Sequence, residues 1–249
     1  MKIKAFILYL IVIAAVFYLV NACGPAKEAT QAPHEEIVTN PRAEGIDLVL
    51  EFKKGKAHNH PLMAVWVETT DSQYIQTLYV ARSIAKGYYQ HGDKSEGFWK
   101  PGPIRRPAAL PYWAHKRGVK AEDGLFIPSQ KNPMPDAVTS ATPKGDFTLK
   151  TKAMVGDRDK FIVLMEINQT WDWNEYWTNN KYPDNEEYKT SCQPALVYAV
   201  EVDLNKSGNF YKLKPIGHSH YAGENGYLYR DLSTLTTALE IAEGVTLRF

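Results

Sequence analysis

Apolar and polar side chains alternate along several short stretches of the chain, and this alternation predicts β-strands. Leu48 and Leu50 share a face with Ile46, and residues 147–151 alternate in the same way, with the period of a half-buried strand. Similar apolar runs cover residues 62–68, 74–82, 161–168, 195–204 and 210–216. Few helical periods separate them, so we expect an all-β protein, an antiparallel immunoglobulin-like β-sandwich with long loop insertions.

A sandwich buries alternate residues of each strand between its sheets. This pattern assigns to the core Ile46, Leu48, Val65, Val67, Leu149, Ile162 and Val200. Regular patterns fade in residues 83–134 and 171–188, which we expect to be long loops, with one short helix within residues 108–117 that is limited by Pro111. Residues 235–249 fit either a helix or an edge or closing strand.

The N-terminus has the features of an export signal. Lys2 and Lys4 precede an apolar run over residues 5–20, which is short for a membrane span and typical of a signal peptide. Ala22-Cys23 follows and resembles a bacterial lipobox. We expect residues 1–22 to be a lipoprotein signal peptide, Cys23 to carry the membrane lipid, residues 23–43 to form a flexible tether and residues 44–249 a single domain. An uncleaved N-terminal anchor is the alternative, and both place the domain outside the cytoplasm, in the periplasm or at the cell surface.

Composition narrows the function classes further. The net charge is +1 over 249 residues, and no Lys/Arg stripe interleaves with aromatic residues, so we expect no nucleic-acid partner. If Cys23 carries lipid, Cys192 is the one remaining thiol, and we expect it to be a buried small apolar residue outside any internal disulfide. The chain contains neither Gly-x-Ser-x-Gly nor His-Glu-x-x-His, which favours a protein without catalytic residues.

Two histidine pairs are candidate metal ligands. His58 and His60 form one pair, and His218 and His220 form the other. Residues two apart on a strand point to the same face, so each pair could chelate a metal ion, and all four imidazoles could share one site. The alternative is two unrelated turns, because each pair adjoins Pro or Gly.

The aromatic segment 171–177 offers a second kind of site. Trp171, Trp173 and Trp177 could form a stacking platform for a sugar or a flat ring if they are exposed, or an anchor for the sandwich edge if they are buried. Asp172 and Glu175 in the same segment are a possible acid pair for glycoside chemistry, but their separation across a scissile bond does not follow from the sequence.

Residues 136–142 carry a more specific motif. Asp136-Ala137-Val138-Thr139-Ser140-Ala141-Thr142 resembles the flavinylation motif of FMN-binding domains, in which an FAD:protein FMN transferase attaches FMN to the last hydroxyl. The resemblance implies that Thr142 is the FMN acceptor and Asp136 the motif acid, with Thr139 and Ser140 in the cofactor-binding turn. Ser140 stands where that family has Gly. The alternative is a plain turn, closed by side-chain to backbone hydrogen bonds of Asp136 and Thr139.

A wider resemblance covers much of the mature chain, the part after the predicted signal peptide. His58-Asn59-His60-Pro61 with the apolar run that follows, the 136–143 turn, and the Gly145-x-Phe147-Thr148-Leu149 strand resemble an uncharacterised periplasmic β-sandwich domain family, whose sandwich is similar to an immunoglobulin-like domain of the flagellar hook cap. Members accompany FAD:protein FMN transferases and PepSY-type membrane reductases.

The expectation that follows is a lipid-anchored extracytoplasmic binding or accessory protein of a membrane redox or metal-acquisition system, without catalysis of its own. Its expected partners are the membrane lipid through Cys23 and a flavin transferase or a membrane reductase. The alternatives are an electron carrier with FMN covalently attached at Thr142 and a carbohydrate-binding surface protein. Possible cofactors are therefore covalent FMN or a metal ion.

Overall fold

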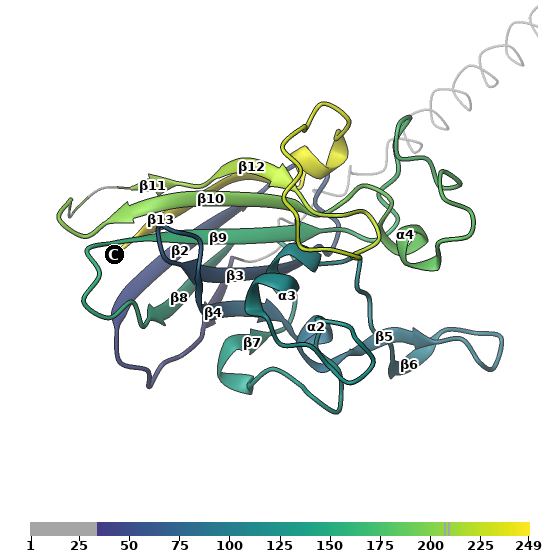
Figure 1. The fold of residues 1–249 in the computed structure, drawn as a ribbon, viewed down its shortest axis with the longest axis horizontal. Coiled ribbons are helices and arrows are strands. Elements are labelled where there is room, and N and C mark those ends of the chain that lie inside the picture. The colour runs from purple at the N-terminus through teal and green to yellow at the C-terminus, as the bar shows by residue number, and fades with distance from the viewer. Residues whose placement is uncertain (1–33, 207, 209) are drawn as a thin grey trace, which may run out of the picture. The chain divides into compact units, whose positions relative to one another are not determined.

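The computed structural model describes residues 34–206, 208 and 210–249, which form two large β-sheets and one small one (Figure 1). The five-stranded sheet has the order β1-β8-β2-β13-β11, the six-stranded sheet has the order β12-β10-β9-β3-β4-β7, and β5 pairs with β6. The strands are β1 (Glu35–Val38), β2 (Ile46–Lys54), β3 (Leu62–Glu68), β4 (Tyr74–Ala81), β5 (Tyr88–Asp93), β6 (Lys100–Pro103), β7 (Thr139–Ser140), β8 (Phe147–Ala153), β9 (Lys160–Asn168), β10 (Leu196–Asp203), β11 (Tyr211–Lys212), β12 (Lys214–His218) and β13 (Ala242–Arg248). The helices are α2 (Arg82–Lys86), α3 (Pro111–Arg117) and α4 (Glu186–Ser191), with 3-10 turns η1 (Asp136–Val138) and η2 (Thr237–Glu240).

The expectation of a mostly-β protein is confirmed, whereas the expectation of purely antiparallel sheets is wrong. β1 runs parallel to β8, and β7 runs parallel to β4. Both are short strands at the end of a sheet order, and no hairpin joins either to its partner. Long connections separate the paired strands, so parallel pairing is sterically possible there.

The domain begins earlier than the sequence predicts. Residues 35–38, which we assigned to the tether, form β1 and pair with residues 147–150 of β8. Only Ile37 of this strand is buried, so the segment has too little apolar periodicity to be recognised. Its neighbour Thr39 is also buried, and its hydroxyl donates to the backbone oxygen of Leu78 across the two sheets (2.7 Å).

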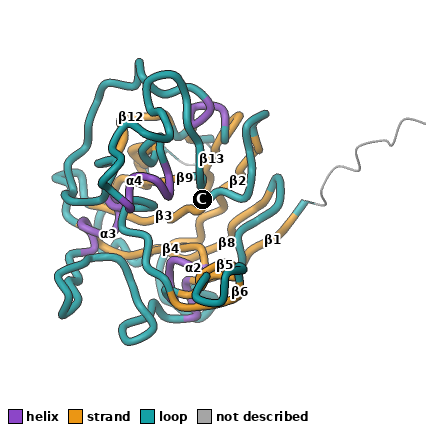
Figure 2. The backbone as a smooth tube through the Cα atoms, turned by 90° about the vertical axis from the view of Figure 1, so that its right-hand side faces the viewer, coloured by secondary structure: helices purple, strands orange, loops and turns teal. Residues whose placement is uncertain are grey.

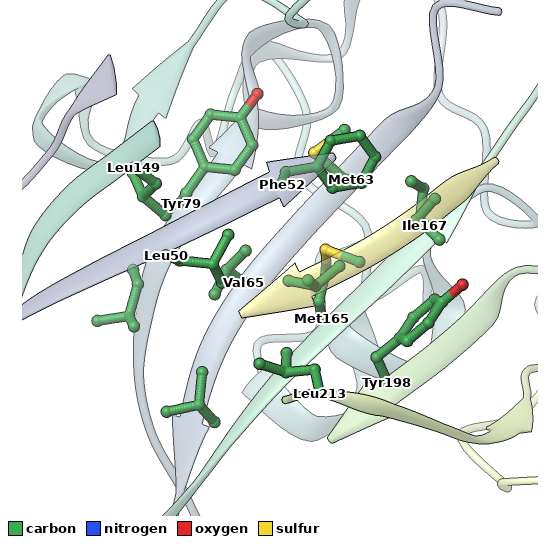
Figure 3. Close-up of a cluster of buried hydrophobic side chains, with 14 of the residues drawn as sticks. Leu50, Phe52, Met63, Val65, Tyr79, Leu149, Met165, Ile167, Tyr198 and Leu213 are labelled. Carbon is green, nitrogen blue, oxygen red and sulfur yellow. The ribbon is translucent and has the colours of Figure 1, made fainter. Parts of the chain in front are cut away.

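The main core lies between the two large sheets (Figure 3). The five-stranded sheet contributes Leu50, Phe52 and Leu149, and the facing sheet contributes side chains such as Met63 and Met165. Phe52 stacks on Phe147 of the neighbouring strand, with 4.9 Å between ring centroids. Burial of this apolar surface is the main stabilising contribution to the fold.

One predicted core residue faces the other way. Phe161 and Val163 of β9 enter the main core, so Ile162 between them points to the opposite face. There it packs with a second apolar cluster. The remaining predictions hold: Leu48, Val65, Val67 and Leu149 are buried in the main core, and Ile46 and Val200 are partly buried against it.

The second cluster lies on the outer face of the six-stranded sheet, under α2 and α3. Figure 2 shows α3 on one side of β3 and β4, with β1 and β2 on the other side. Trp66 and Trp113 are fully buried in this cluster. The predicted short helix begins at Pro111, where the missing amide hydrogen costs nothing. The outer face is apolar because it is covered, which is why β3 is buried along its whole length.

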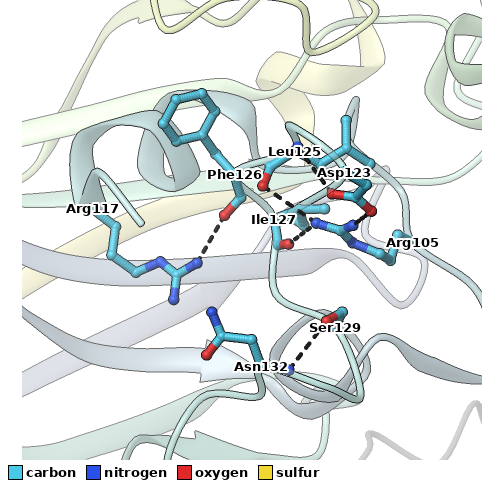
Figure 4. A network of polar contacts seen from close by, with 8 residues as sticks. All are labelled: Arg105, Arg117, Asp123, Leu125, Phe126, Ile127, Ser129 and Asn132. Atoms are coloured by element: carbon cyan, nitrogen blue, oxygen red, sulfur yellow. Dashed lines mark hydrogen bonds and ion pairs between the residues drawn. The ribbon is translucent and has the colours of Figure 1, made fainter. Parts of the chain in front are cut away.

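Polar contacts to backbone oxygens hold the loop that follows α3 (Figure 4). Arg117 donates to the oxygen of Phe126 (2.8 Å). Arg105 contacts the carboxylate of Asp123 and donates to the oxygen of Ile127. Two guanidinium groups therefore satisfy carbonyl groups that no strand pairs, and the long connection is ordered without a sheet of its own.

The C-terminal part differs in detail from the pattern. Residues 210–216 do not form one strand, because the chain passes from β11 in one sheet to β12 in the other at buried Leu213. Residues 242–248 form a strand, as one alternative predicts, and η2 precedes it. β13 lies between β2 and β11 rather than at an edge.

The predictions for the signal peptide, for lipidation of Cys23 and for most of the tether lie outside the described residues. Within the described part of the chain, no helix combines the length and the apolar character needed to cross a membrane.

Candidate functional site

A cavity of about 770 Å³ brings together residues from distant parts of the chain. Its walls come from α2, β5, the end of the β5–β6 loop, and the loops that carry Arg106, Thr142 and Trp171. In Figure 1 the β5–β6 hairpin and the loop with α4 extend to the same side of the two large sheets. The cavity therefore forms where loop insertions gather, which is where folds commonly place binding sites.

Aromatic side chains line part of this cavity. Trp99 is 44% exposed and Trp171 is 58% exposed, although both are large apolar residues, and Tyr88 is 39% exposed. Exposed Trp and Tyr rings offer flat surfaces on which another ring can stack. The cavity thus has the apolar, aromatic lining that small-molecule sites use.

Basic side chains line the same cavity. Arg82, Lys86 and Arg106 all contribute to its wall. Lys86 is engaged elsewhere, because its ammonium lies 2.7 Å from the carboxylate of Asp136 and donates to the oxygen of Met134 (3.1 Å). Arg82 and Arg106 form no ion pair with the carboxylates of the described residues. The charges of these two guanidinium groups are therefore available to an anionic ligand, although the Arg106 group lies over the ring of Tyr89.

The residues of the flavinylation motif lie at and beside this cavity. Thr142 lines it, half-buried. Asp136 is exposed, and the hydrogen bond and charge of Lys86 hold its pKa below the ordinary value. Thr139 and Ser140 form β7, and the Thr139 hydroxyl donates to the backbone oxygen of Asp136 (3.3 Å). Of the two hydrogen bonds that the plain-turn interpretation expects, the Thr139 bond is present, whereas the Asp136 carboxylate pairs with Lys86. The same turn also presents Thr142 to the cavity.

Two residues of the cavity wall have left-handed backbone conformations. His60 has φ of 49° and Trp171 has φ of 56°. Bulky residues rarely adopt positive φ, and such positions cost of order 1–3 kcal/mol each. Strained backbone of this kind concentrates at ligand-binding sites, so it is consistent with a function for the cavity.

The aromatic segment 171–177 divides into exposed and buried parts. Trp177 is 7% exposed and packs against the rings of Tyr188 and Tyr221. It is therefore an anchor, and a sugar platform cannot include it. Trp173 is 55% exposed but does not line the cavity. Of the three tryptophans, only Trp171 faces the cavity.

The two acids of this segment have different environments. Asp172 is buried, accepts a hydrogen bond from the hydroxyl of Thr237, and burial raises its pKa above the ordinary value. Glu175 is exposed in the loop that follows. The segment therefore contains one carboxyl in a structural hydrogen bond and one carboxyl in solvent, and neither lines the cavity.

The histidine pairs are not placed on strands as the spacing argument requires. His58 and His60 lie in the loop between β2 and β3, and only His60 lines the cavity. His218 ends β12, where its Nδ1 donates to the Ser219 oxygen (2.8 Å), and His220 lies beyond the strand with Nδ1 accepting the amide of Ala222 (3.2 Å). Among the described residues, no three His, Cys, Asp or Glu side chains cluster as metal ligands do. The structure thus does not bring the four imidazoles together.

Cys192 is fully buried, as expected. Burial, with a smaller contribution from Asp172, raises the pKa of its thiol to about 11. A thiol in this environment is protonated at neutral pH and is a poor nucleophile.

Several cavity residues are missed by the sequence patterns. Arg82, Tyr89, Trp99 and Arg106 belong to or adjoin the region where strand periodicity fades. A usable signal is the run Gly87-Tyr88-Tyr89 together with Gly97-Phe98-Trp99, two aromatic pairs that each follow a glycine. That arrangement is compatible with a short hairpin, which β5 and β6 form.

Comparison with known proteins adds no further identification. The chain matches no protein-family model, no curated protein and no solved structure.

Proposed function

We propose that this chain is a non-catalytic extracytoplasmic binding protein of a membrane redox system, anchored by lipid at Cys23, and that the cavity is its ligand site. We also propose that its two large sheets form an immunoglobulin-like sandwich. The observation that carries the binding function is the meeting of exposed aromatic rings with two guanidinium groups that form no ion pair among the described residues, in a cavity of about 770 Å³. A ligand that fits this lining has a flat ring and a negatively charged group.

The cavity also explains why three separate sequence signals coexist. Thr142 from the hydroxyl-rich turn, Trp171 from the aromatic segment and His60 from a histidine pair all line it. Each signal alone has a plain structural explanation. Their meeting in one wall, two of them at strained backbone positions, supports a common role in binding.

Binding is tested by titrating the full chain with FMN, which has a flat ring and a phosphate, while tryptophan fluorescence is recorded. The proposal predicts saturable quenching that is strongly weakened by Trp171→Ala. Trp173→Ala is the matched control, because Trp173 is equally exposed but lies outside the cavity. Absence of saturable binding to the unmodified chain contradicts the proposal, and equal losses in the two variants instead support an exposed aromatic platform such as a sugar site.

A second candidate function is favoured by the position of Thr142. In an electron carrier with covalent FMN, the Thr142 Oγ1 attacks the phosphorus in the FMN half of FAD. The Oγ1–P bond forms, the bond from this phosphorus to the bridging oxygen breaks, AMP leaves, and the hydroxyl proton passes to a base of the FMN transferase. The half-buried Thr142 lines the cavity beside Ala141, so an attached FMN could place its ring there.

The intact mass of the chain co-expressed with an FAD:protein FMN transferase separates the two candidates. The covalent carrier predicts an FMN-sized increment on the peptide that contains Thr142, lost in Thr142→Ala and kept in Thr139→Ala, whose hydroxyl is buried in β7. An unmodified mass leaves reversible binding as the function of the cavity.

A further inference from the structure

Two buried polar atoms without hydrogen-bond partners lie in residues of the same cavity wall. They are Nε of Arg106 and the hydroxyl oxygen of Tyr89. Buried polar groups are almost always paired, because leaving one unpaired costs about 1–3 kcal/mol. Two such groups in neighbouring side chains therefore indicate a position for a polar ligand group.

The two side chains are held together. The guanidinium carbon of Arg106 lies 4.8 Å from the ring centroid of Tyr89. Burial raises the pKa of the Tyr89 hydroxyl, an effect that the positive charge of Arg106 partly offsets. Both groups are therefore hydrogen-bond donors at neutral pH, and together they present one positive charge and donors of two kinds.

In the part of the chain that the structure describes, no formed ion pair neutralises the charge of Arg106. The Ser83 hydroxyl is a hydrogen-bonding neighbour that counteracts the rise in the pKa of Tyr89, but the pair does not have the geometry of a formed hydrogen bond. Glu187 of α4 is the acidic group that interacts with Arg106 through charge. Burial raises the pKa of Glu187, and the positive charge of Arg106 lowers it again in part. Within the described residues, no ion pair forms between Glu187 and Arg106. The guanidinium of Arg106 can therefore pair with an anionic ligand in the cavity.

The geometry points to an oxyanion subsite formed by Arg106 and Tyr89, which binds the phosphate group of the ligand. This inference rests on the proposed function of the cavity and names the chemical class of its ligand, a phosphate-bearing molecule. It does not require Thr142, because a ligand can be held at this subsite without a covalent bond. A guanidinium fork and a phenol hydroxyl both match the acceptor oxygens of a phosphate.

The test measures binding of three probes to the full chain: inorganic phosphate, FMN and riboflavin, which differs from FMN only by the phosphate. We expect FMN to bind at least about tenfold more tightly than riboflavin, as a hydrogen bond to a charged group implies. Arg106→Gln removes this preference and leaves riboflavin binding unchanged. Tyr89→Phe keeps the ring and reduces the preference about threefold to tenfold. Arg248→Gln is the matched control, because Arg248 belongs to β13, outside the cavity, and it retains the preference.

The outcomes separate the subsite from the proposed function. Equal binding of FMN and riboflavin overturns the subsite while the cavity remains a binding site. Phosphate binding that depends on Arg106, without binding of FMN or riboflavin, supports the subsite for the free anion and contradicts the proposed ring-binding function. If inorganic phosphate competes with FMN but binds far more weakly, the ligand of the subsite is a phosphate ester rather than free phosphate. Unchanged FMN preference in both Arg106→Gln and Tyr89→Phe overturns the assignment of these residues.

Discussion

The buried carboxyl group of Glu166 predicts that the stability of the domain depends on pH in a specific way. Glu166 lies on β9 with no exposed surface and accepts the amides of Tyr112 (3.2 Å) and Trp113 (2.7 Å) at the start of α3. Burial raises its pKa from 4.5 to about 8, although these hydrogen bonds favour the charged form. The protonated form is therefore preferred in the folded protein at neutral pH.

The sign and the size of the effect follow from proton linkage. Between pH 4.5 and 8 the folded chain holds the Glu166 proton and the unfolded chain loses it, so the free energy of unfolding falls as pH rises. The contribution is complete below pH 4.5 and is lost as pH rises through 8. One such group changes the free energy of unfolding by about 1.4 kcal/mol per pH unit, or roughly 3 kcal/mol between pH 5.5 and pH 7.5.

Glu166→Gln tests this prediction in urea unfolding of the full chain at both pH values. Glutamine is uncharged and keeps one acceptor, so we expect a loss of about 1–3 kcal/mol at pH 5.5 from the weakened amide contacts. At pH 7.5 the unmodified chain has lost roughly 3 kcal/mol of stability that Glu166→Gln does not lose. The gap between their free energies of unfolding therefore shrinks by that amount or reverses in sign. The pKa values of half-buried His58 and His220 and of buried His218 are lowered by burial and act in the opposite direction. They are the same in both proteins, so they cancel in the comparison.

Glu201→Gln is the control, because Glu201 is exposed on β10 and its replacement removes the same charge. It should retain the pH dependence of the unmodified chain. If the free energies of unfolding of Glu166→Gln and of the unmodified chain instead change in parallel between pH 5.5 and pH 7.5, the raised pKa of Glu166 does not contribute to stability.

Three further predictions concern the fold and the thiol. Iodoacetamide should leave Cys192 unlabelled in the native chain and label it after unfolding in urea, because the thiol is buried with a pKa of about 11. Peptide mass spectrometry measures the labelling, and rapid labelling of the native chain contradicts this. Ile37→Ala should lower the free energy of unfolding by about 2–5 kcal/mol, whereas Val38→Ala on the exposed side of β1 changes it by less than about 0.5 kcal/mol; equal effects contradict the assignment of β1 to the core. Trp177→Ala should cost about 3–5 kcal/mol in the same assay, and a cost as small as that of Trp173→Ala contradicts its role as an anchor.

The longer strands of the two large sheets could be predicted because their apolar periodicity reflects burial, whereas the short edge strands β1 and β7 lack such a pattern. Leu48, Leu50 and Phe52 alternate with polar residues, since one face of β2 meets the core and the other does not. Apolar alternation does not predict the orientation of β9, because both faces of this strand are buried. The pattern alone does not show whether Ile162 or Phe161 faces the other large sheet.

The candidate site was predictable only in fragments. Thr142, Trp171 and His60 each stand out in the sequence, but nothing in it shows that they line one cavity. Arg106 and Tyr89 were missed because their role depends on a contact across the cavity wall and on unpaired buried atoms. Such features are properties of the tertiary structure and leave no periodic pattern.

A cavity that holds a phosphate-bearing ligand with a flat ring should contain FMN in an experimental structure of the full chain determined with FMN. We expect the ring against Trp171 and phosphate oxygens within hydrogen-bond distance of Arg106 and Tyr89. FMN bound outside this cavity, or a cavity without FMN at saturating concentration, would contradict this expectation.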